Sequence, residues 1–126
     1  MNPHLILAGR ILLSVIFIVA GFGKLTGAAG FSEGLAGMGF PAPLLMAYAV
    51  ALFELLAGLA ILVGFQIRVA AILLALFCVA TGLLAHLGEQ SALLKNFALA
   101  GGFLVLAGSG AGALALDKPR RVSRYA

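Results

Sequence analysis

Four long apolar segments take up most of this chain, and they constrain its fold more than any other feature. We place them at residues 5–24, 42–64, 67–87 and 95–116, separated by stretches rich in glycine, proline and polar residues. A helix needs about 20 predominantly apolar residues to cross the hydrocarbon core of a bilayer, and each segment meets that length. The sequence therefore predicts an all-α, up-and-down bundle of four transmembrane helices, which forms a single integral membrane domain over residues 1–126.

The composition agrees with a membrane protein and argues against a soluble one. Hydrophobic residues make up 63% of the chain and charged residues only 10%, with a mean hydropathy of +1.20, whereas about a quarter of the residues are charged in an ordinary soluble domain. Half of the basic residues lie in the C-terminal tail, at Lys118, Arg120, Arg121 and Arg124. Basic residues that follow a spanning helix contact anionic lipid, so we expect a lipid bilayer as a partner and no nucleic acid.

The positions of the basic residues predict the orientation, because cytoplasmic ends of spanning helices carry an excess of lysine and arginine. The basic tail and Arg68 fall on one side of the membrane, whereas Lys24 and Lys95 fall on the other. We therefore predict that both termini are cytoplasmic, as an even number of spans requires. No lysine or arginine precedes Leu5, and we interpret the first segment as a retained helix rather than a cleaved signal peptide.

The longest connection, residues 26–40, has two interpretations. Its glycine content suits an irregular loop, but Phe31, Leu35 and Met38 recur at helical spacing. That spacing favours a short amphipathic segment in the outer interface, between the first and second spanning helices, which Pro41 would end.

Small and polar residues recur every three or four positions in the first three segments, so each segment has one face of this kind. The three faces are Arg10, Ser14, Phe17, Gly21 and Lys24; Ala47, Ala51, Glu54, Gly58 and Ile61; and Arg68, Ala71, Ala75, Cys78, Gly82 and His86. Such residues belong at helix contacts in a membrane, because lipid offers a polar group no partner. We expect the three faces to meet, with the fourth segment packing against them as a wall.

Glu54 lies near the centre of its segment, where a lone charge costs about 2.5–3.5 kcal/mol. It must be protonated or find a positive partner, and Arg10 has a similar expected depth, so we predict an Arg10–Glu54 pair. In a functional interpretation the two residues relay a proton or bind a ligand. In a structural interpretation they form a buried salt bridge that fixes the register of two helices.

Lys24 and His86 end their faces at the outer surface and are further ligand-binding candidates. They could hold the oxygens of a quinone-like head group, and His86 could move a proton near neutral pH. Alternatively, Lys24 extends toward the headgroups and His86 caps a helix. Arg68 is either an interfacial anchor or a fifth candidate.

Other chemistry finds little support in the sequence. Nucleotide-binding, zinc-protease and serine-hydrolase motifs are absent. Two distant histidines predict no metal site, and the lone Cys78 cannot form an internal disulfide.

An ordered set of short motifs resembles the DoxX family of small membrane proteins. The set comprises Arg10, Ile-Phe-Ile-Val-Ala-Gly-Phe-Gly-Lys24, Gly30-Phe31, Gly-Phe-Pro41, Phe-Glu54-Leu-Leu-Ala-Gly58, Leu-Val-Gly64-Phe-Gln-Ile-Arg68 and His86. The resemblance runs from about residue 5 to residue 87 and continues more loosely to the end of the chain.

The resemblance implies a four-helix protein of the bacterial inner membrane. Some members are associated with quinone-linked sulfur oxidation, and others with membrane redox complexes or oxidative-stress resistance. Carried over by position, the family pattern marks Arg10, Lys24, Glu54, Arg68 and His86 as the polar residues to follow. This chain lacks a cysteine pair, which argues against direct dithiol exchange, and it lacks the additional domain of a complete sulfur-oxidising enzyme.

We therefore expect a subunit of a membrane redox system that binds a small molecule, with a quinone as the expected cofactor and a redox protein as the expected partner. A non-catalytic scaffold or assembly factor with a structural ion pair is the alternative, and the sequence alone does not decide whether the chain is an enzyme. A transporter is a weaker hypothesis, because four short helices leave little room for alternating access unless the chain forms a homo-oligomer.

Overall fold

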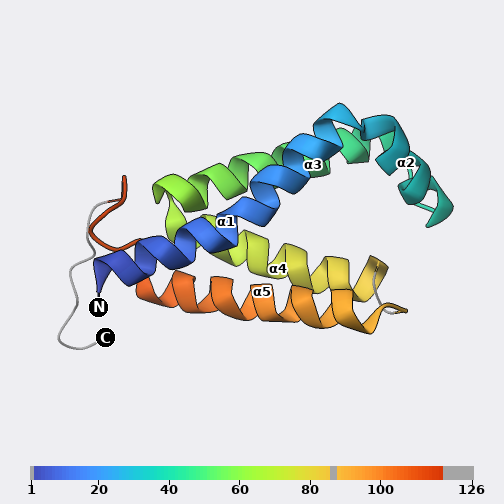
Figure 1. The fold of residues 1–126 in the computed structure, drawn as a ribbon. Helices are drawn as coiled ribbons and strands as arrows, with labels where there is room; N and C mark the ends of the chain where they lie inside the picture. Colours follow the sequence, from blue (N-terminus) through green and yellow to red (C-terminus); the bar gives the residue numbers. More distant parts are fainter. Residues whose placement is uncertain (1, 86–87, 118–126) are drawn as a thin grey trace.

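The computed structural model describes residues 2–85 and 88–117, and over this part of the chain it confirms the predicted all-α fold (Figure 1). The helices are α1 (Pro3–Thr26), α2 (Ala28–Gly37), α3 (Pro43–Val63), α4 (Ile67–Ala85) and α5 (Gln90–Ser109). All except α2 are long and apolar enough to cross a membrane. The glycine-rich connection is thus helical over α2 and not an irregular loop.

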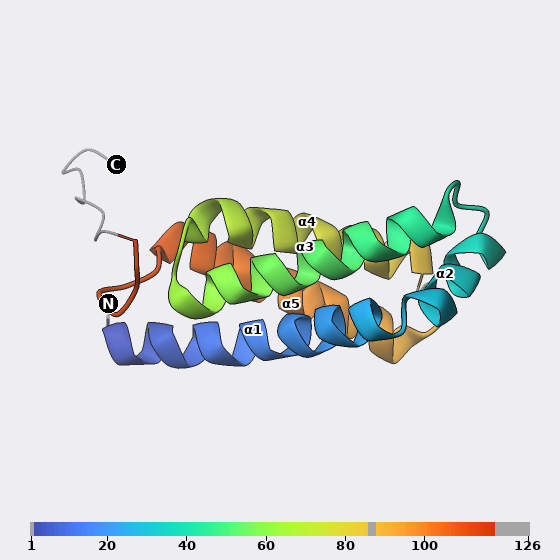
Figure 2. The same cartoon turned by 90° about the horizontal axis from the view of Figure 1, so that it is seen from above.

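The four long helices alternate in direction and form two pairs (Figures 1 and 2). α1 packs along α3, and α4 packs along α5. The pairs lie close together at the end that holds the N-terminus, which we call the N-terminal end. They diverge toward the opposite end, which we call the α2 end because α2 folds back there onto α3 (Figure 1).

The ends of the helices follow from capping residues in the sequence. The Asn2 side chain accepts hydrogen bonds from the backbone N–H groups of His4 and Leu5, and Pro3 occupies the first position of α1, where proline loses no helical hydrogen bond. α3 ends at Gly64, whose φ of +73° is a left-handed conformation that favours glycine.

α1 and α3 approach each other through glycine. A Cβ atom added to Gly21 would lie 2.6 Å from the backbone nitrogen of Leu55, and one added to Gly58 would lie 3.1 Å from the side chain of Ile18. Small residues let helix backbones come this close in a membrane. The two contacts fix the register of the pair, with Gly21 level with Leu55.

The buried residues confirm the predicted faces of α1 and α3. They are Arg10, Ser14, Phe17 and Gly21 on α1, and Ala47, Ala51, Glu54, Gly58 and Ile61 on α3. Between the pairs, the Phe17 ring meets the edges of Phe77 and Phe103, with centroids 6.3 Å and 5.4 Å apart. This aromatic contact joins the two pairs near the middle of the bundle.

Arg10 is 1% exposed and ties the N-terminal end of the bundle together. Its guanidinium donates to the backbone oxygens of Ile61 and Leu62 at 3.0 Å and 2.7 Å, and to those of Ala111 and Leu114 at 2.8 Å each. The carbonyl groups at a helix C-terminus have no helical partner and carry partial negative charge. One arginine therefore donates hydrogen bonds both to the carbonyl groups at the end of α3 and to carbonyl groups of the segment after α5.

The last helix ends at Ser109 and not at the predicted residue 116. Gly110 and Gly112 have positive φ values of +83° and +78°, so α5 ends at Ser109 and the chain turns across the bundle. The Asp117 carboxylate then accepts hydrogen bonds from the backbone N–H groups of Gln66 and Ile67 at the start of α4. These contacts hold the α3–α4 turn against residues 110–117.

We expect Arg10→Lys to lower the free energy of unfolding by about 3 kcal/mol, because an ammonium group cannot reach four carbonyl oxygens and charge-assisted hydrogen bonds contribute about 1.5–3 kcal/mol each. Thermal unfolding in detergent, followed by circular dichroism, measures this loss. Arg68→Lys is the matched control, because Arg68 is half-buried at the same end and its side chain makes no hydrogen bond within the described residues. Equal losses in the two variants would contradict the role given to Arg10.

Candidate functional site

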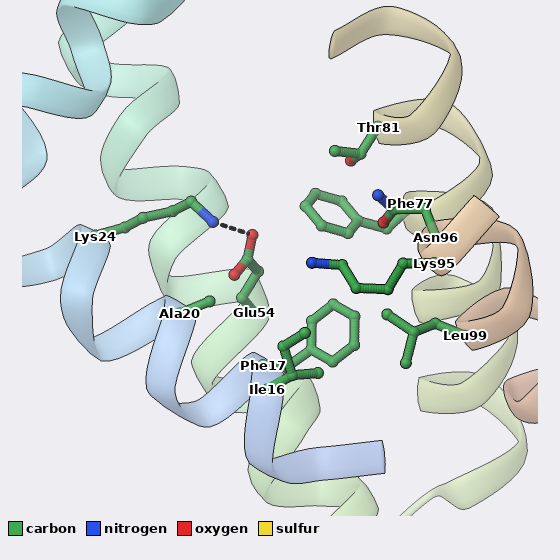
Figure 3. Close-up of a pocket in the computed structure, with 10 residues that line it drawn as sticks. All are labelled: Ile16, Phe17, Ala20, Lys24, Glu54, Phe77, Thr81, Lys95, Asn96 and Leu99. Atoms are coloured by element: carbon green, nitrogen blue, oxygen red, sulfur yellow. Dashed lines mark hydrogen bonds and ion pairs between the residues drawn. The ribbon is translucent and has the colours of Figure 1, made fainter. Parts of the chain in front are cut away.

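A pocket of about 140 Å³ lies between the two helix pairs, toward the α2 end (Figure 3). Its walls come from four helices that are far apart in the sequence. The lining residues are Ile16, Phe17, Ala20, Lys24, Glu54, Phe77, Thr81, Lys95, Asn96 and Leu99. The pocket occupies the space that opens where the two pairs diverge, beyond the aromatic contact of Phe17.

Glu54 pairs with Lys24 and not with Arg10, so the predicted Arg10–Glu54 pair is wrong. The Lys24 Nζ donates to the Glu54 Oε1 at 2.8 Å. The register of α1 and α3 explains the difference. The contact of Gly21 with Leu55 brings the end of α1 beside Glu54, whereas Arg10 meets the end of α3 about two helical turns away.

The two side chains of this ion pair differ in how much of their surface is exposed. The Glu54 side chain is 3% exposed, and that of Lys24 is 26% exposed. The Lys24 Nζ also lies 5.1 Å from the centre of the Phe31 ring of α2, within the range of a cation–π contact. Lys24 therefore links α1, α2 and α3 at one point and supplies the positive charge that a carboxylate needs at this depth.

The α4–α5 pair contributes the polar residues Thr81, Lys95 and Asn96, none of which the sequence indicated as site residues. The Lys95 side chain points across the pocket toward the Glu54 carboxylate (Figure 3). The sequence predicts that the last spanning segment begins at Lys95 and packs as a wall, but α5 begins at Gln90, so Lys95 lies more than one turn inside the helix. The sequence signal that could have indicated these site residues was the adjacent polar pair Lys95 and Asn96 at the start of an apolar run.

Apolar side chains form the rest of the pocket. The rings of Phe17 and Phe77 stand on either side of Lys95 in Figure 3, and Ile16 and Leu99 close the side toward the N-terminal end. Phe77 is itself held by Phe53 of α3, with ring centroids 5.3 Å apart. The site therefore combines an aromatic, apolar cleft with three ionisable groups that converge from the two helix pairs.

The remaining candidates do not join this pocket. Arg10 lies at the N-terminal end with its guanidinium satisfied by carbonyl oxygens, and Arg68 is in the first turn of α4 at that same end. His86 lies outside the described residues. Cys78 is fully buried in the core between the pairs. In the described part of the chain, no group of three or more histidine, cysteine, aspartate or glutamate residues could hold a metal ion.

This arrangement is suited to binding a small ring compound with polar oxygens and to exchanging a proton with it. Two ammonium groups can donate hydrogen bonds to oxygen acceptors, and a carboxylate can accept or return a proton. The aromatic walls can hold a flat ring. Apolar and aromatic walls around convergent polar groups are typical of small-molecule sites, and here five of the ten lining residues are polar or charged.

We expect Lys24→Met to destabilise the protein more than Glu54→Gln does. Removing Lys24 leaves a buried carboxylate without its partner, whereas an unpaired Lys24 can extend toward the interface. The cost of a lone charge, about 2.5–3.5 kcal/mol, is an upper limit because Lys95 is nearby, so we expect a loss of about 1–2 kcal/mol for Lys24→Met and less for Glu54→Gln.

Thermal unfolding in detergent of both single variants and of the double variant measures these losses. The double variant should be as stable as Glu54→Gln alone, because it contains no unpaired carboxylate. If Glu54→Gln proves the more destabilising single change, Lys24 is not the group that keeps Glu54 inside the bundle.

Comparison with known proteins identifies the family of this chain. The family model named DoxX matches residues 5–87. Inner membrane protein YqjF of Escherichia coli K12 is 42% identical over 118 residues, which cover 90% of this chain and 89% of that protein. Inner membrane protein YphA of the same bacterium is 34% identical over 127 residues, which cover 93% and 91%. No solved structure gives a significant match. With its four apolar helices, the chain is therefore a multi-pass inner membrane protein that belongs to the DoxX family.

Proposed function

We propose that this protein binds the ring of a quinone, or of a closely similar small molecule, as a subunit of a membrane redox system. The observation that carries the proposal is the pocket in which Lys24, Glu54 and Lys95 meet the rings of Phe17 and Phe77. A quinone has the matching chemistry, since its flat apolar ring suits the aromatic walls and its carbonyl oxygens can accept hydrogen bonds from the ammonium groups.

The size of the pocket supports a ligand that enters with one ring. An apolar cavity of about 150 Å³ in another protein binds benzene, and this pocket measures about 140 Å³. Sites for larger ligands usually measure about 300–1,000 Å³. The pocket lies in the opening between two helix pairs, so the tail of a lipid quinone can remain outside among the acyl chains.

In this proposal each ionisable residue has one role. Lys24 and Lys95 hold the quinone oxygens, and Glu54 exchanges a proton with the bound ring. Reduction of a quinone to a hydroquinone takes two electrons and two protons. We assign both electrons to a partner redox protein, the transfer of one proton to Glu54, and the second proton to water at the open side of the pocket. Arg10 has no part in the relay and serves to hold the N-terminal end of the bundle.

We expect Ala20→Leu to weaken quinone binding at least about tenfold, because the larger side chain fills a pocket that is already small. Ala80→Leu is the matched control, since Ala80 is exposed on α4 and does not line the pocket. Equilibrium dialysis of a short-chain ubiquinone against protein in nanodiscs measures the affinity, and thermal unfolding shows whether both variants are folded. Unchanged binding by folded Ala20→Leu would place the quinone elsewhere or nowhere.

The alternative is a scaffold whose polar residues only stabilise the bundle. The Arg10 network favours it, because four hydrogen bonds from one side chain join two helix ends and contribute nothing to the pocket. The same binding assay separates the two functions. A wild-type protein that binds no quinone, together with a loss of stability in Lys24→Met, is the result that a scaffold predicts.

We further propose that both termini face the cytoplasm. In the structure Arg68 lies at the N-terminal end, as does the segment that leads to the basic tail, and cytoplasmic ends carry the excess of basic residues. The pocket then opens toward the outer face of the inner membrane.

Cysteine labelling in intact cells measures this orientation. A membrane-impermeant maleimide should label Glu33→Cys on α2 and should leave His4→Cys at the other end unlabelled, since both side chains are exposed at opposite ends of the bundle. Cys78 gives no background because it is fully buried. Labelling of His4→Cys alone would reverse the proposed orientation.

A further inference from the structure

We propose that the pocket takes its ligand as an anion, a ring compound with an ionised oxygen, and that Lys95 is the residue that selects the negative charge. The inference rests on the proposed function, because it names the form in which the ring compound binds at that same site. It starts from the charges of the lining residues.

The pocket carries an excess of positive charge. Among its ten lining residues three are ionisable, namely Lys24, Glu54 and Lys95, so two ammonium groups face one carboxylate. Lys24 and Glu54 neutralise each other across 2.8 Å. The charge of Lys95 is left over, since within the described residues no hydrogen bond or ion pair engages its side chain.

The Lys95 side chain is exposed as a whole, but its charged end faces the pocket. Figure 3 shows the Lys95 Nζ directed toward the Glu54 carboxylate, between the rings of Phe17 and Phe77. A positive charge among apolar walls interacts more strongly with a counter-charge than it would in water. A neutral ligand would leave this charge uncompensated, a cation would increase it, and an anion would bring the site to neutrality.

The chemistry of the walls narrows the class of anion. Thr81 and Asn96 lie on the α4–α5 side with Lys95, while Ile16, Phe17 and Leu99 supply apolar surface. A small inorganic anion would leave that apolar surface unused. A ring compound with one ionised oxygen, such as a hydroxylated quinone or an acidic phenol, places its charge on Lys95 and its ring between the aromatic side chains.

Two probes of nearly equal size test the inference. A naphthoquinone with a hydroxyl group on its quinone ring is an anion at neutral pH, because that hydroxyl is a vinylogous carboxylic acid, and its methyl ether is neutral. We expect the wild-type protein in nanodiscs to bind the anion about tenfold more tightly than the ether, the equivalent of one charge-assisted hydrogen bond. Equilibrium dialysis with absorbance detection measures both affinities.

Variants of Lys95 show whether this residue causes the preference for the anionic probe. Lys95→Gln should abolish the preference, because it should weaken binding of the anion about tenfold more than binding of the ether, whereas Lys95→Arg, which keeps the charge, should retain the preference. Lys95 is exposed on its helix, and unchanged thermal unfolding confirms that the variants are folded. Glu54→Gln provides the opposite test, because removing the negative charge should strengthen binding of the anion relative to the ether.

The outcomes separate this inference from the proposed function. Equal affinity of the wild type for the two probes would overturn the selection of an anion, while binding of the ether would still support a quinone-type site. A Lys95→Gln variant that binds both probes less well by the same factor would also overturn it, because Lys95 would then act on shape and not on charge. Failure of the wild type to bind either probe would overturn both proposals.

Discussion

The Arg10 network is the interaction on which the rest of the bundle depends. Its four backbone acceptors come from the end of α3 and from the segment after α5, so one buried side chain fixes both helix pairs at the N-terminal end. Without such a partner, the last carbonyl groups of a helix inside a bilayer would be unsatisfied. Asp117 reinforces the same end by capping the start of α4. Because this end is held so firmly, the pairs can diverge at the other end without the fold coming apart.

The pocket is a consequence of that divergence. Where two apolar helix pairs separate in a membrane, the space must be filled by side chains, lipid or ligand, because a void forfeits packing contacts. Here the space is lined by the rings of Phe17 and Phe77, which contact each other, and by lysines from two different helices. Polar groups would be costly in such a place unless they met each other or a ligand. This cost is the physical reason to treat the α2 end as the functional end and the N-terminal end as structural.

One glycine contact between α1 and α3 positions the basic side chains at both ends of the bundle. The close contact of Gly21 with the backbone of α3 sets the register that brings Lys24 to Glu54 and Arg10 to the end of α3. A shift of one turn would move both basic side chains away from their acceptors. The site and its support therefore depend on the same helix contact, although no residue of that contact lines the pocket with its side chain.

The sequence by itself determined the helical architecture, the alternation of the spans and the faces that are buried, because hydrophobic length and the spacing of small and polar residues are local properties. It also singled out Glu54, Arg10 and Lys24, because an ionisable group in an apolar run requires a partner. Only the tertiary structure decided which acceptor each basic side chain binds. Depth along a single helix could not separate Arg10 from Lys24 as the partner of Glu54, since the choice depends on the register between α1 and α3. The part of Lys95 in the pocket depends on where α5 begins and on the angle between the helix pairs, and no single segment of the sequence encodes that angle.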